Sequence, residues 1–152
     1  MVNINEALKI NIASKDVIII GCPGSGKTYF ANKINDIHHS LIHTDDYIKH
    51  GFVNSMYEAL NDVIKCNNNT IVEGVQGYRL LRHGARSNTY NPDIVFELVI
   101  SNDTLIELYD SKRDYDKLEF VMKMNRANDK VLRDYKSIVN NLPEWHTITN
   151  DR

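Results

Sequence analysis

At 152 residues the chain is long enough for one domain with its own core, spanning 1–152, and too short for a motor or a large remodelling ATPase. A formal net charge of −2 argues against a surface devoted to long nucleic acid, and two cysteines argue against a disulfide framework and for a reducing compartment. Because no apolar run reaches the length of a membrane span and residues 1–16 lack a signal-peptide pattern, we expect a cytoplasmic protein with no membrane partner.

The first predicted elements are an N-terminal arm and a buried strand. Scattered apolar residues in 1–16 predict a short helix or arm packed on the edge of the domain. The β-branched run at 17–20 then predicts a strand buried on both faces. This strand leads directly into a segment that meets the pattern Gly-x-x-x-x-Gly-Lys-Ser/Thr in full, Gly21-Cys22-Pro23-Gly24-Ser25-Gly26-Lys27-Thr28.

This glycine-rich segment has the chemistry of a phosphate-binding loop. Its glycines allow consecutive backbone N–H groups to turn inward around phosphate oxygens, while Lys27 would reach the outer phosphates and the Thr28 hydroxyl would bind Mg²⁺. Phe30, Ala31, Ile34 and Ile37 predict a helix after the loop, with its positive N-terminal end towards the same anion. The sequence therefore predicts a nucleoside triphosphate site with Mg²⁺, formed by residues 21–28 together with Tyr29.

Two acids follow the next predicted strand, at 40–44. Ligands of parallel α/β sheets bind beyond the carboxyl ends of the strands, so Asp45 and Asp46 stand where a site is expected. One of them would take a proton from an acceptor hydroxyl or hold Mg²⁺, and Asp45 is preferred because it is nearest the strand end. The alternative is that both acids cap the next segment and remain solvated.

A helix and a third strand come next. Residues 54–65 have a helical apolar stripe, and Ser55 with Glu58 predicts a capping box at its start. The strand at 70–72 ends at Glu73 and Gly74, where many nucleotide hydrolases have a magnesium-linked acid. Glu73 is therefore either a site residue or a solvated strand end.

Arginines gather at 78–86, where the sequence predicts a short helical or irregular segment. On a helix Arg79, Arg82 and Arg86 have the spacing i, i+3 and i+7, so they share one face. Their planar guanidinium groups suit an anionic substrate, although a run of charges can equally be a solvated face.

The remaining elements complete an α/β pattern. A strand at 94–100 and a helix capped by Asp103 precede a charged connector at 110–117, in which Lys112 and Arg113 make a candidate mobile lid. A long helix over 118–141 and a strand at 145–149 follow, and the six histidines show neither metal-ligand spacing nor an evident acid partner. Alternating strands and helices predict a single three-layer α/β domain with a five-stranded parallel sheet.

Three motifs carry a resemblance to a known family. The loop, the run Thr44-Asp45-Asp46-Tyr47 and the run Ser111-Lys112-Arg113 resemble the kinase domain of phage-type polynucleotide 5′-hydroxyl kinases, and more broadly the small P-loop kinases of nucleosides and nucleotides. The resemblance implies a three-layer P-loop NTPase fold with sheet order 2-3-1-4-5 and a short lid. It further implies that Asp45 is the general base, that Lys27 and Thr28 hold the donor and Mg²⁺, and that Arg113 is the lid arginine.

The chain also departs from that family. Tyr109 and Asp110 stand where the polynucleotide kinases carry a further basic residue, and the third strand ends in Glu73-Gly74 rather than in their aspartate-containing pattern. The arginines after Glu73 also suit a nucleoside monophosphate acceptor, as in adenylate-kinase-like enzymes.

These observations lead to one functional expectation and one alternative. We expect an ATP- and Mg²⁺-dependent phosphotransferase that acts on a nucleoside, a nucleotide or a nucleic-acid 5′ end, with Asp46, Glu73 and the three arginines near the acceptor. The alternative is a nucleotide-binding switch or NTPase module without a small-molecule acceptor. The Asn-Lys-x-Asp and Asp-x-x-Gly motifs expected of a GTPase-type switch are not in the sequence.

Overall fold

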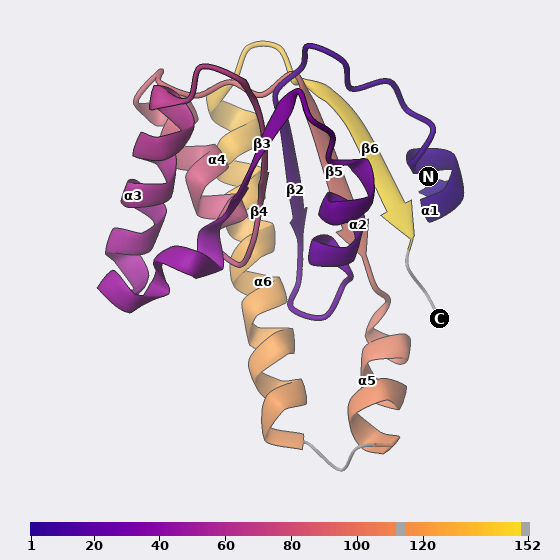
Figure 1. The fold of residues 1–152 in the computed structure, drawn as a ribbon. Helices are drawn as coiled ribbons and strands as arrows, with labels where there is room; N and C mark the ends of the chain where they lie inside the picture. Colours follow the sequence, from indigo (N-terminus) through magenta and orange to yellow (C-terminus); the bar gives the residue numbers. More distant parts are fainter. Residues whose placement is uncertain (112–114, 150–152) are drawn as a thin grey trace.

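A single sheet of parallel strands forms the centre of the protein in the computed structural model, which describes residues 1–111 and 115–149 (Figure 1). The sheet has six strands in the order β1-β6-β5-β2-β4-β3. Their bounds are β1 Val2–Asn3, β2 Val17–Gly21, β3 His39–His43, β4 Asn69–Glu73, β5 Ile94–Val99 and β6 Glu144–Thr149. The fold class is therefore α/β with an all-parallel sheet, as predicted.

Helices cover both faces of the sheet and make the arrangement three-layered (Figure 1). Side chains of β2 alternate between the layers: Ile19 packs with α1 and α2, whereas Ile18 and Ile20 pack with α3, α4 and α6. Every residue of β2 is buried, which is why its sequence is a continuous β-branched run. The helical elements are α1 Ile4–Ala7, α2 Lys27–Ile34, the 3₁₀ helix η1 Thr44–His50, α3 Phe52–Lys65, α4 Gly77–Arg86, α5 Asn102–Ser111 and α6 Tyr115–Ile138.

The prediction of a five-stranded sheet is wrong, because the segment predicted as an arm contributes the short strand β1. Val2 pairs with Ile148 and Asn3 with Thr149, so β1 extends the sheet at the β6 edge. Counting β1 also changes the strand order from the predicted one, while the five longer strands run β3-β4-β2-β5-β6. A two-residue strand is too short to leave an alternating pattern in the sequence.

Several helix ends differ from their predictions. The helix α3 begins at Phe52 with Gly51 as its N-cap, so the predicted capping box is wrong, and Ser55 lies inside the first turn with its N–H bonded to Gly51 O. The helix α2 ends at Ile34, which leaves Ile37 outside it and 92 % exposed. At the start of α5 the Thr104 N–H donates to Ser101 Oγ at 3.1 Å, so this end is capped locally by a serine rather than by Asp103.

The helix α5 and the first part of α6 project beyond the carboxyl end of the sheet, while the later part of α6 lies along the sheet (Figure 1). Cys22 of the glycine-rich loop packs there against Leu105 and Tyr109 of α5 and Val121 of α6. Most of the connector predicted as a lid is the adjoining ends of these two helices, and Lys112 and Arg113 lie outside the described residues. Within the described ranges, no helix is long and apolar enough to cross a membrane.

Candidate functional site

The glycine-rich loop lies at the carboxyl end of the central strand β2 and leads into α2. Gly26 is the N-cap of α2 and has φ +94°, a left-handed conformation that glycine adopts without strain. The strand, the tight loop and the helix therefore appear in the order that the phosphate-binding pattern requires.

Lys27 is folded back onto this loop. Its side chain is only 7 % exposed, and Nζ donates a hydrogen bond to Cys22 O at 2.9 Å. Burial lowers the pKa of the Lys27 amine, while the negative charges of Glu73 and Asp45 act in the opposite direction. The hydrogen bond recorded for this amine goes to a neutral carbonyl oxygen, so an incoming anion would replace it with a charge-assisted hydrogen bond.

A short chain of polar side chains links α2 to the ends of β4 and β3. Thr28 Oγ1 lies 3.4 Å from each carboxylate oxygen of Glu73, and the Nδ1 atom of His43 contacts Glu73 Oε1. Glu73 is 2 % exposed, so the predicted alternative of a solvated strand end is wrong. His43 and Glu73 face each other in the parallel register of β3 and β4. The sequence alone does not indicate that His43 has Glu73 as its acid partner, because the pairing depends on the register of β3 and β4.

The donor set at Thr28 and Glu73 fits a magnesium ion. Hydroxyl and carboxylate oxygens are hard ligands of the kind that Mg²⁺ prefers, and nucleotide enzymes complete its coordination with substrate phosphates and water. Among residues 1–111 and 115–149, no group of three or more His, Cys, Asp and Glu side chains could hold a metal ion alone. Within the described residues, Thr28 and Glu73 therefore offer two protein ligands, and a metal ion there would need further ligands from outside the chain.

Asp45 is held at the end of β3 by the turn that follows β4. Its Oδ1 atom accepts the Val75 N–H at 3.0 Å, and the neighbouring Thr44 Oγ1 accepts the Gln76 N–H at 3.3 Å. Gly74 allows this close approach: it has φ +134°, and a Cβ atom there would lie 2.0 Å from Thr44 Oγ1. Among the described residues, the hydrogen bonds of the exposed Asp45 carboxylate are made through Oδ1, and none is recorded for its second oxygen, Oδ2.

Asp46 lies apart from its neighbour. It is exposed and borders a hollow of about 420 Å³ between η1 and α3, together with Tyr47, Glu58 and Asp62. Asp45 does not line this hollow. The two acids therefore serve different surfaces, and the structure associates Asp45, not Asp46, with the turn after Glu73.

The three arginines of α4 also separate. Arg79, in the first turn, lines a groove between α4 and α6, near the turn that holds Asp45. Arg82 makes an ion pair with Asp134 of α6 at 3.0 Å, and Arg86 lies 3.9 Å from the same carboxylate. The structure thus brings Arg79 towards the candidate site, while substrate contact by the other two stays a prediction.

Two further predicted site residues remain to be placed. Tyr29 is 57 % exposed on α2, where the Nζ atom of Lys33 lies 5.6 Å from the centre of its ring. Arg113 lies outside the described residues, so its predicted role at the donor is not described by the structure.

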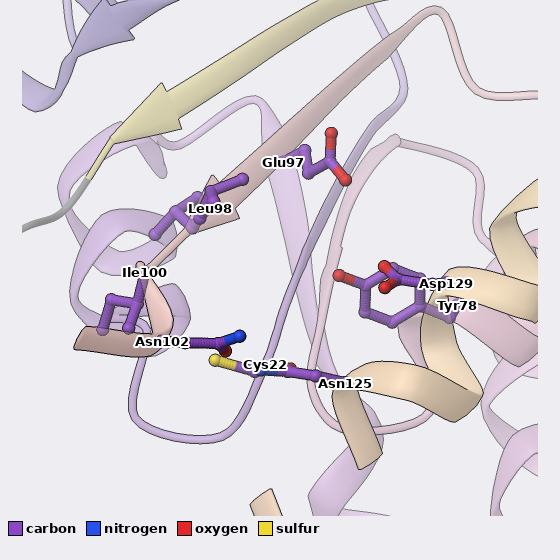
Figure 2. Close-up of a pocket in the computed structure, with 9 residues that line it drawn as sticks. Cys22, Tyr78, Glu97, Leu98, Ile100, Asn102, Asn125 and Asp129 are labelled. Atoms are coloured by element: carbon purple, nitrogen blue, oxygen red, sulfur yellow. The ribbon is translucent and has the colours of Figure 1, made fainter. Parts of the chain in front are cut away.

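A small polar cavity of about 190 Å³ lies behind the loop (Figure 2). Cys22 meets Asn125 of α6 there, and Tyr78 lies beside Asp129 and across from Glu97. Burial raises the pKa of the Cys22 thiol, and burial together with the Glu97 carboxylate raises that of the Tyr78 phenol. The cavity therefore presents an uncharged thiol and phenol together with the carboxylates of Glu97 and Asp129, which do not attract phosphate. We expect an anion to bind on the other side of the loop, where Lys27 lies.

Comparison with known proteins does not assign this chain to a family. Neither the family models nor the curated sequences include a match to this chain. The function is therefore argued from the residues of the site and their geometry.

Proposed function

We propose that this protein is an ATP- and Mg²⁺-dependent kinase of the P-loop type. It would transfer the γ-phosphoryl group of ATP to a hydroxyl or phosphate of a nucleoside, a nucleotide or a nucleic-acid 5′ end. One observation carries the proposal: a complete phosphate-binding loop and an anchored carboxylate, Asp45, lie at the ends of strands on either side of β4.

The donor half of the proposed site is the loop with the first turn of α2. Backbone N–H groups of the loop and the N-terminal end of α2 would surround the phosphates of ATP. Lys27 would exchange its hydrogen bond to Cys22 O for one to a phosphate oxygen, which satisfies its buried charge better than a carbonyl does. Mg²⁺, held by Thr28 with Glu73 behind it, would neutralise charge on the phosphates when bound.

The transfer step assigns one role to each of two side chains. The acceptor oxygen forms a bond to the γ-phosphorus, the bond between that phosphorus and the β-phosphate oxygen breaks, and ADP leaves. When the acceptor is a hydroxyl, its proton passes to the Asp45 carboxylate, which the Val75 N–H holds in place through Oδ1. Lys27 stabilises the negative charge on the phosphoryl group in the transition state of the transfer.

The anchoring of Asp45 favours a kinase over a switch. A nucleotide-binding switch or an NTPase without an acceptor needs the loop and Mg²⁺. Such a protein does not require the arrangement at Asp45, in which the Val75 N–H of the turn after β4 holds one carboxylate oxygen and the other oxygen remains available. This difference also determines the test.

The direct test is transfer of label from [γ-³²P]ATP in the presence of Mg²⁺. The acceptor panel contains nucleosides, mononucleotides and oligonucleotides with a 5′ hydroxyl, and we expect one class to become labelled. Asp45→Asn should reduce transfer to a hydroxyl by about 10²- to 10⁴-fold while ATP still binds. Asp46→Asn is the matched control and should have a much smaller effect.

Two results would count against the proposal. Label recovered solely as inorganic phosphate, with no acceptor labelled, would favour the NTPase or switch. Labelling of a hydroxyl acceptor at an unchanged rate by Asp45→Asn would remove the base assignment.

A further inference from the structure

A groove of about 460 Å³ runs between the start of α4 and the first half of α6. One of its walls is Val75, whose backbone N–H holds Asp45. The groove therefore adjoins the proposed general base, on the side of the sheet covered by α3, α4 and α6. A molecule lying in it would have one end close to the transfer site.

The α6 wall of the groove is an apolar strip. Phe120, Met124 and Ala127 are spaced i, i+4 and i+7, so they lie on one face of the helix. Phe120 is 58 % exposed, which places a large aromatic ring in water along the groove. An exposed aromatic side chain in a groove favours a flat, unsaturated ring as its ligand.

The charges of the groove point to an anion. Arg79 lines the groove from α4, and Lys123 lines it from α6. The buried side chain of Asn128 is a further polar group in its lining. No acidic residue is among the described residues that line it. Guanidinium and ammonium groups bind phosphate oxygens through charge-assisted hydrogen bonds.

We propose that this groove binds the phosphate acceptor and that the acceptor is a nucleotide unit. Its base would stack on Phe120 and Met124, its existing phosphate would contact Arg79 and Lys123, and its reacting oxygen would face Asp45. This inference rests on the proposed kinase function and narrows its acceptor. A nucleoside lacks the phosphate that the two cations recognise, and a sugar lacks the ring that the aromatic strip recognises.

A free mononucleotide and the terminal unit of a single strand share this chemistry. They differ in where the phosphate is attached. The terminal nucleotide of a strand with a free 5′ hydroxyl has its phosphate on the 3′ oxygen, whereas a 5′-mononucleotide has it on the 5′ oxygen. The probes are therefore thymidine, its 5′-monophosphate, its 3′-monophosphate and a thymidine hexanucleotide with a 5′ hydroxyl. A thymine base separates acceptor binding from binding at a donor site for ATP.

The experiment is calorimetric titration of the full chain with each probe in the absence of ATP. We expect at least one phosphate-bearing probe to bind about tenfold tighter than thymidine. Preference for the hexanucleotide and the 3′-monophosphate would identify a nucleic-acid end, and preference for the 5′-monophosphate would identify a mononucleotide. Either preference supports the inference.

Variants of the groove test its residues one at a time. Phe120→Ala should weaken nucleotide binding about tenfold through lost stacking, and Lys123→Gln about fivefold with a shallower salt dependence. The matched controls are Leu142→Ala, another exposed apolar side chain, and Lys130→Gln, an exposed lysine on α6 that does not line the groove. Neither control should change binding.

Three results would overturn the inference: equal affinity for thymidine and the nucleotides, wild-type affinity in both groove variants, or no binding of any probe. A change in sedimentation on Phe120→Ala, without a change in probe binding, would instead assign the strip to a second copy of this chain. Titration with ATP and Mg²⁺ distinguishes the two proposals. If ATP binds and the groove variants bind nucleotides normally, the groove assignment alone fails; if ATP does not bind, the kinase proposal fails.

Discussion

The two halves of the proposed site are built differently. In the loop half, the polar side chains already have partners within the protein: Lys27 donates to the backbone carbonyl oxygen of Cys22, and Thr28 contacts the Glu73 carboxylate. In the groove half, Phe120 and Lys123 lie exposed along a helix face. The loop half would bind its ligand by exchanging internal contacts for phosphate and Mg²⁺, whereas the groove half would bind by covering exposed surface. Changes in the first should therefore alter the rate, and changes in the second the affinity for the acceptor.

The largest expected effect is at Lys27. Lys27→Ala removes the buried cation proposed to hold the transferred group, and we expect kcat for transfer to fall by about 10³-fold or more. Lys33→Ala is the matched control, because Lys33 is an exposed lysine on the same helix. Steady-state kinetics with labelled ATP measures both variants. Similar kcat values for the two would contradict the central role of the loop.

Gly74→Ala should be the most destabilising change at the turn that fixes Asp45. The new Cβ would lie 2.0 Å from Thr44 Oγ1 and 3.0 Å from Asp45 Oδ1, in addition to strain from the positive φ. Gly51→Ala is the control, because its φ is +95° but no atom lies closer than 3.9 Å. We expect urea unfolding to show about 2 kcal/mol more destabilisation for Gly74→Ala than for Gly51→Ala. Equal losses would show that the turn is not tightly packed.

His43→Ala should have a moderate effect on both stability and rate. It leaves the buried Glu73 carboxylate without its histidine partner, which is expected to lower the free energy of unfolding by about 1–3 kcal/mol. Because Glu73 in turn contacts Thr28, we also expect about a tenfold weaker response to Mg²⁺ in transfer assays. His38→Ala, at an exposed histidine before β3, is the control. An unchanged Mg²⁺ titration would separate His43 from the donor half.

The smallest expected effect is at Arg82. Arg82→Gln breaks a partly exposed ion pair with Asp134, which typically contributes about 1 kcal/mol or less to stability. The acceptor KM should change far less than in Arg79→Gln, because Arg79 lines the groove and Arg82 does not. Kinetics of the two variants side by side provides the measurement. A larger KM change in Arg82→Gln would restore the predicted substrate role of Arg82.

The loop half of the proposed site can be proposed from the sequence, and the groove half cannot, for a physical reason. A phosphate-binding loop needs particular residues at fixed spacing within one segment, so the pattern that contains Gly26 and Lys27 predicts it without any tertiary information. The contact between His43 and Glu73 depends on the register of two strands 30 residues apart, which no local pattern contains. The sequence predicts a helix at Phe120 but not the exposure of this side chain, because that exposure depends on how α6 packs against α4.

The most direct test of this account is a crystal structure with a non-hydrolysable ATP analogue and Mg²⁺. We predict that the phosphates lie on the glycine-rich loop, that Lys27 Nζ has left Cys22 O for a phosphate oxygen, and that Mg²⁺ contacts Thr28 Oγ1. Phosphates bound elsewhere, with the Lys27 to Cys22 contact intact, would contradict the account.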